Sequence, residues 1–129
     1  MKKLIFGVDF DGTVVTHEFP EIGEDIGAQD VLKELTAGGH KIILFTMRSN
    51  NKDRNYLDEA VQWFKDNEIP LFGINENPDQ HTWTSSPKPY CHIYVDDAAL
   101  GCPLKMPVAS RPYVDWDQVR WSLKVRGEI

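Results

Sequence analysis

The sequence predicts an α/β fold with an open, mostly parallel sheet flanked by helices, in a single domain over residues 1–129. Three observations support this prediction. Short apolar runs alternate along the chain with segments of helical periodicity, the order typical of a parallel α/β sheet. Several of the apolar runs end in carboxylates or hydroxyls. The length of 129 residues suits one compact domain.

The predicted strands are apolar runs bounded by turn residues, as in strands that are buried on both faces of a parallel sheet. They comprise residues 3–9, 41–46, 71–74 and 91–95, with residues 104–109 as a fifth strand. Pro103 and Pro107 confine this fifth strand to an edge, because proline cannot donate to a sheet ladder.

The predicted helices carry apolar residues at i, i+3, i+4 and i+7, which gives each of them one apolar face. They comprise residues 25–37, 50–67 and 115–126. Gly38 and Gly39 end the first helix and Pro70 follows the second. Trp116 and Trp121 lie on the last helix, where burial in the core is the first expectation and a contact in a homo-oligomer is the alternative.

The first strand ends in two carboxylates, Asp9 and Asp11, followed by Gly12. The two-residue period of a strand points both aspartates the same way. Two like charges at the end of a buried strand are costly unless they are compensated. A hard cation such as Mg²⁺, bound by carboxylate and carbonyl oxygens, would supply that compensation.

Composition excludes several classes of function. The formal net charge of −6 argues against non-specific binding to nucleic acid or to an anionic membrane. Cys91 and Cys102 form neither a C-x-x-C motif nor a disulfide framework, so a reducing cytoplasm is the expected location. No segment is long and apolar enough to span a bilayer.

Four motifs occur in order along the chain, and together they resemble those of the haloacid dehalogenase-like (HAD) superfamily. They are DFDGT at residues 9–13, KIILFT ending in Thr46, Lys88, and IYVDD ending in Asp96-Asp97. The resemblance covers residues 4–97 and implies a Rossmann-like sheet with Mg²⁺-dependent phosphoryl transfer through an aspartyl-phosphate. The second aspartate of the first motif is the feature that phosphatases of the family share and dehalogenases lack. We therefore expect a phosphatase domain that acts on a small phosphorylated metabolite.

The resemblance also implies residue roles. Asp9 would be the nucleophile, and Asp11 would donate a proton to the leaving oxygen and then take one from water. Mg²⁺ would be held by the Asp9 side chain, the Asp11 carbonyl and Asp96, with Asp97 as an outer ligand. The expected phosphate contacts are Thr46, the backbone N–H of Met47, and Lys88. In many relatives the lysine lies further upstream, on a helix.

Arg48 follows this motif directly and is expected either to bind a substrate phosphate or carboxylate bidentately or to form a surface salt bridge.

The spacing of the motifs predicts that no cap domain is inserted. Asp11 and Thr46 are 35 positions apart, and Thr46 and Lys88 are 42 apart. Both intervals are filled by the predicted helices, strand and loops. The acidic residues of the loop after Asp11 would repel a polyanion, which argues against a nucleic-acid substrate. The long loop over residues 75–89 is the expected second wall of the site.

Three alternatives remain open. The first is a non-catalytic module that binds phosphate or a nucleotide on the same scaffold. The second is a phospho-acceptor domain similar to a response-regulator receiver, although receivers place their acidic pair and their phosphorylated aspartate on different strands. The third is a metal-dependent nuclease, against which the acidic loop argues.

Overall fold

The computed structural model describes residues 2–129 and has the predicted α/β architecture. Four parallel strands of the described chain form one sheet in the order β3-β2-β1-β4. These strands are β1 (Ile5–Val8), β2 (Lys41–Leu44), β3 (Gly73–Ile74) and β4 (Ile93–Val95). The helices are α1 (Ala28–Ala37), α2 (Tyr56–Asp66) and α3 (Trp116–Val125). None of the helices within residues 2–129 has the length and apolar character needed to cross a membrane.

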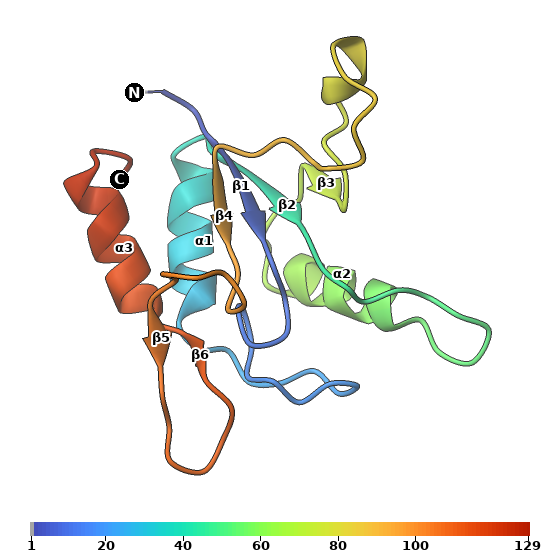
Figure 1. Cartoon of the computed structure of the whole chain (residues 1–129), viewed down its shortest axis with the longest axis vertical. Helices are drawn as coiled ribbons and strands as arrows, with labels where there is room; N and C mark the ends of the chain where they lie inside the picture. The colour runs from blue at the N-terminus through green and yellow to red at the C-terminus, as the bar shows by residue number, and fades with distance from the viewer. Residues whose placement is uncertain (1) are drawn as a thin grey trace.

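All three helices pack against one face of the sheet (Figure 1). The strand residues of that face alternate with those of the other, as the two-residue period requires. Phe6 and Val8 of β1 lie in register with Ile42 and Leu44 of β2, and these four are buried in one cluster. The same cluster contains the inner faces of the helices, through residues such as Leu32, Phe64 and Trp116. The core therefore lies on one side of the sheet.

The helices of the described residues leave the other face of the sheet uncovered (Figure 1). Gly7 is in register with Tyr94, and a Cβ at Gly7 would lie 2.8 Å from Cys91 Sγ and 3.1 Å from Tyr94 Cδ1. Glycine is required there because the two side chains cross the strand at this point. The Tyr94 hydroxyl donates to the Pro89 carbonyl at 2.8 Å and so fixes the end of the long loop over this face. That loop contains a short 3₁₀-helix, Gln80–Thr82.

The second helix is shorter than the prediction of residues 50–67, because α2 begins only at Tyr56. Asn51 Oδ1 accepts hydrogen bonds from the backbone N–H groups of Asp53 and Arg54 and so holds a turn. Asn50 Oδ1 accepts from the N–H groups of Leu57 and Asp58 in the first turn of α2. Asparagine side chains compete with helical hydrogen bonding in this way, which explains the delayed start.

The predicted edge strand over residues 104–109 is also corrected. Only Leu104–Lys105 is extended, as β5, and it pairs antiparallel with β6 (Tyr113–Val114), which the sequence did not predict. This hairpin is separate from the main sheet. It docks beside the end of β1, where the Val114 N–H donates to the Gly12 carbonyl at 3.0 Å. The hairpin therefore lies next to the aspartate motif.

Trp116 and Trp121 differ in their surroundings. Trp116 is buried, and its indole N–H donates to the Thr13 carbonyl at 2.6 Å, which ties α3 to the aspartate motif. Trp121 is 67% exposed on the outer side of α3. Only Trp116 thus belongs to the core.

Candidate active site

The aspartate motif leaves β1 and turns back sharply at the carboxyl end of the sheet. The turn depends on Gly12, whose φ of +81° is unfavourable for residues with a Cβ. A Cβ at Gly12 would also lie only 2.5 Å from Asp97 Oδ2. The backbone of this glycine therefore lets the end of β4 approach the end of β1 closely.

Three carboxylates meet at this edge. Asp9, Asp96 and Asp97 each place one oxygen within 4.8 Å of the others. This grouping follows from the topology, since β1 and β4 are parallel neighbours and their carboxyl ends share one edge. Hard carboxylate oxygens at this separation suit a hard divalent cation, and Mg²⁺ is the natural candidate.

The hydroxyl of Thr13 connects the carboxylates, a role that the sequence analysis did not assign to it. Thr13 Oγ1 lies 2.9 Å from Asp9 Oδ2 and 3.3 Å from Asp97 Oδ1, and its single proton can be donated to either. The same oxygen accepts a hydrogen bond from the Asp97 N–H at 3.0 Å. Thr13 is fully buried, so it holds the two strand ends in a fixed relation. Its position directly after a D-x-D-G run was the available signal.

The charges of the cluster are poorly compensated by the protein itself. Burial, and then the neighbouring charge of Asp96, raise the pKa of Asp9 from 3.8 to about 8. Burial is also the main cause that raises the pKa of Asp96. Both shifts have the direction expected when desolvation and like charges disfavour the ionised form. A bound cation would reverse this preference, so the residues present fit Mg²⁺ in charge as well as in ligand type.

Asp11 lies in the same cavity but is held by Arg48. Arg48 Nε and one terminal nitrogen donate to the two oxygens of Asp11, each at 2.8 Å. The guanidinium also donates to the carbonyls of Glu21 and Tyr56. Arg48 is 4% exposed, and its donors are largely used within the protein. The pair is bidentate, but its carboxylate is that of Asp11 rather than a substrate group, and it is buried rather than a surface salt bridge.

Thr46 and Met47, the expected phosphate contacts, line the cavity. The Thr46 N–H donates to Asn75 Oδ1 at 2.8 Å, and Thr46 Oγ1 accepts from the Arg48 N–H at 3.1 Å. These contacts leave the Thr46 hydroxyl proton available for a phosphate oxygen. The Met47 side chain is 95% exposed. The prediction that the loop over residues 75–89 forms the second wall of the site is wrong, because none of its residues lines this cavity. The loop reaches the site only indirectly, through the hydrogen bond of Asn75 with Thr46.

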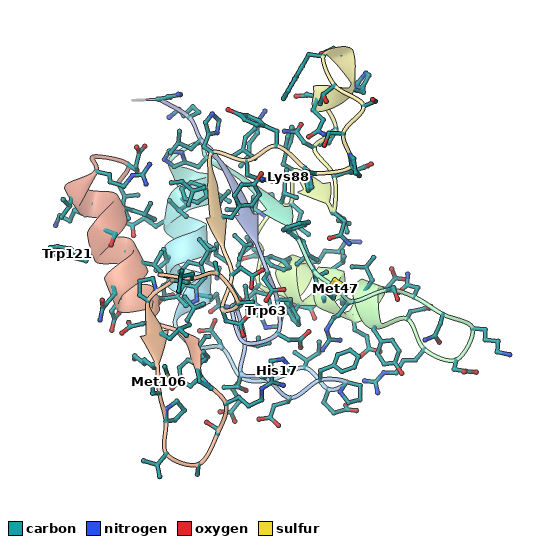
Figure 2. All side chains as sticks on the ribbon, viewed as in Figure 1. His17, Met47, Trp63, Lys88, Met106 and Trp121 are labelled. Atoms are coloured by element: carbon teal, nitrogen blue, oxygen red, sulfur yellow. The ribbon has the colours of Figure 1, made fainter. Side chains whose placement is uncertain are left out.

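The prediction that Lys88 belongs to the site is not supported by its position. Lys88 lies over the helix-free face of the sheet, with its Nζ 5.2 Å from the centre of the Tyr94 ring. It lines a separate hollow of about 340 Å³ together with Trp83, Tyr90 and Cys91. Figure 2 shows Lys88 toward the amino end of β1, whereas His17 lies at the carboxyl end. Lys88 therefore lies away from the strand ends that carry the aspartates.

The cavity has a volume of about 380 Å³, which suits a small ligand. Besides the predicted residues it is lined by His17 and Phe19 from the loop after β1 and by Arg111 from the β5–β6 hairpin. These three residues were not among the predicted site residues. No motif marks them, because they reach the cavity through tertiary packing of two loops.

A solved structure of a conserved protein from Bacteroides thetaiotaomicron is similar to this chain, with 30% sequence identity and a TM-score of 0.76. The similarity covers 97% of this chain and 93% of the Bacteroides protein. No family model and no curated protein matches the sequence.

Proposed function

We propose a phosphohydrolase activity for this chain, which belongs to the same family as the conserved protein from Bacteroides thetaiotaomicron. The proposed activity is Mg²⁺-dependent hydrolysis of a small phosphate monoester through an aspartyl-phosphate on Asp9. The observation that carries the proposal is the convergence of Asp9, Asp96 and Asp97 within 4.8 Å. Asp11 and Thr46 line the same cavity. The finer fold assignment, a Rossmann-like HAD phosphatase without a cap domain, is part of this proposal.

Asp9, Asp96 and Asp97, with the Asp11 carbonyl, would hold Mg²⁺, which would supply positive charge for the carboxylates and for the phosphoryl group. Asp9 is the nucleophile of the proposed reaction, since a carboxylate that attacks phosphorus divides a slow hydrolysis into two easier steps. The buried Thr13 hydroxyl orients the Asp9 carboxylate. The Thr46 hydroxyl donates to a phosphate oxygen, and water later attacks the aspartyl-phosphate to release inorganic phosphate.

Asp11 transfers the protons in both halves of this reaction. It gives a proton to the leaving oxygen in the first half and takes one from water in the second. For this it must exchange part of its contact with Arg48 for a contact with the substrate, because both of its oxygens accept from the guanidinium in this structure.

The Arg48–Asp11 pair also favours a second candidate function, a non-catalytic module that binds phosphate or a nucleotide. Both oxygens of Asp11 accept from the guanidinium, so neither of them is directed at a leaving group. In this alternative Asp11 serves only to position Arg48 and the surrounding loops, and the cavity binds its ligand without turnover.

Release of inorganic phosphate separates the two candidates. The wild-type protein is assayed with Mg²⁺ on an aryl phosphate and on a panel of phosphorylated metabolites. Asp9→Asn removes the nucleophile, and Asp79→Asn is the matched control, since Asp79 is exposed and does not line the cavity. Turnover by the wild type and by Asp79→Asn, abolished in Asp9→Asn, supports the phosphohydrolase. Phosphate binding by calorimetry without turnover on any compound supports the binding module instead.

A further inference from the structure

We propose that Arg111, on the turn between β5 and β6, binds an anionic group of the substrate at the mouth of the aspartate cavity. This inference rests on the proposed function and adds a substrate-binding residue that lies outside the four sequence motifs. Arg111 comes from the hairpin that docks against the Gly12 carbonyl, so its element is anchored to the aspartate motif.

The charge of the cavity calls for a cation. Four carboxylates line it, and the two guanidiniums are those of Arg48 and Arg111. A bound divalent cation together with both guanidiniums would only balance these carboxylates. The two negative charges of a phosphate monoester would then need every available positive group close to them.

Arg111 is the guanidinium that remains available. The side chain of Arg48 is 1% exposed and already forms an ion pair with Asp11. By contrast, no carboxylate within residues 2–129 lies at ion-pair distance from Arg111. Arg111 is exposed at the surface of the cavity, where a ligand can reach it.

His17 holds Arg111 beside the aspartates without neutralising it. A terminal nitrogen of Arg111 lies 3.3 Å from His17 Nδ1. Because a guanidinium only donates, His17 Nδ1 is the acceptor in this contact. A Cβ at Gly12 would be 3.3 Å from His17 Cδ2, so this edge of the ring faces the aspartate motif. The pair therefore presents N–H donors to the cavity and retains its positive charge.

A guanidinium recognises phosphoryl and carboxylate oxygens by the same planar, bidentate geometry. The anionic group bound by Arg111 is therefore either the phosphoryl group that is transferred or a second anion on the leaving part of the substrate. Two substrates distinguish these sources. They are propyl phosphate and the phosphate ester of 3-hydroxypropionate, which adds a carboxylate to a similar chain.

The test compares wild type with Arg111→Met and Arg111→Lys in the presence of Mg²⁺. Binding of inorganic phosphate is measured by calorimetry, and kcat and KM are measured for both esters. Arg126→Met is the matched control, because Arg126 is exposed and does not line this cavity. We expect Arg111→Met to weaken the anion contact by about tenfold to a hundredfold, as for loss of a charge-assisted hydrogen bond. Arg111→Lys should recover part of the loss, and the thermal midpoint should stay near that of the wild type.

Each outcome has a defined meaning. Weaker binding of phosphate and of both esters supports the inference with the phosphoryl group as the source. A loss confined to the carboxylated ester supports it with the second anion as the source. If Arg111→Met equals Arg126→Met in every measurement while the wild type binds phosphate, the inference is wrong and the proposed function stands. If the wild type neither binds phosphate nor hydrolyses any ester, the proposed function itself fails, and this inference with it.

Discussion

Replacing the central carboxylate of the cluster should stabilise the metal-free protein. Asp9→Asn keeps the size of the side chain and an oxygen that can accept from the Thr13 hydroxyl. It removes the negative charge that burial and Asp96 disfavour. We therefore expect the variant to unfold at higher denaturant concentration than the wild type when Mg²⁺ is chelated at neutral pH.

The magnitude follows from the pKa of Asp9, which rises from 3.8 to about 8 on folding. The wild type loses stability as the pH rises, because Asp9 ionises readily in the unfolded chain above pH 3.8 and resists ionisation in the folded one up to about pH 8. From these two pKa values, the loss of unfolding free energy at pH 7 is at most about 4 kcal/mol. This value is an upper bound, because water that enters the open cavity screens the charges. Asp9→Asn escapes this loss, and its advantage should vanish near pH 4.

The assay is urea unfolding from pH 4 to pH 9 with a chelator and then with Mg²⁺, using Asp79→Asn as the control for one removed charge. Mg²⁺ at a hundred times its dissociation constant should stabilise the wild type by about 2.7 kcal/mol and Asp9→Asn by much less. If Asp9→Asn is no more stable than Asp79→Asn at pH 8 without metal, the aspartates are solvated and the reasoning about the cluster is wrong.

Three further predictions concern single positions. Gly12→Ala should cost about 2 kcal/mol of unfolding free energy and weaken Mg²⁺ binding measured by calorimetry. The reasons are that φ at Gly12 is +81° and that the new Cβ would lie 2.5 Å from Asp97 Oδ2. Unchanged binding would mean that this turn does not position the carboxylates. Arg48→Met should cost about 3 kcal/mol of unfolding free energy, measured with urea, because it leaves Asp11 unpaired. Adding Asp11→Asn should recover part of this loss. An equal loss in the double variant would contradict a stabilising Arg48–Asp11 pair. Lys88→Met should leave phosphate release unchanged, since Lys88 lies over the Tyr94 ring; a large loss of kcat would show that the loop brings it to the cavity.

Much of the fold and part of the site could be predicted from local sequence. Apolar runs and helical periodicity predicted the main strands and helices, because the spacing of apolar residues follows from the burial of one face of each element. The convergence of Asp9 with Asp96 was predictable for a related reason. Parallel strands bring their carboxyl ends to one edge, so two acidic strand ends that are far apart in sequence meet there. Periodicity also suggested the burial of Trp116.

The sequence by itself determined that aspartates lie at the ends of two strands. Only the tertiary structure decided which basic side chains lie close to them. Arg48 is paired with Asp11, Lys88 lies on the helix-free face, and Arg111 lines the cavity although it follows no motif. These positions depend on the paths of loops. A loop's path is fixed by tertiary contacts such as the hydrogen bond of Val114 with Gly12, which no periodic sequence pattern predicts. The regular hydrogen bonds between parallel strands fix the positions of the strand ends. The positions of long basic side chains on loops depend instead on the packing and charge of their tertiary surroundings.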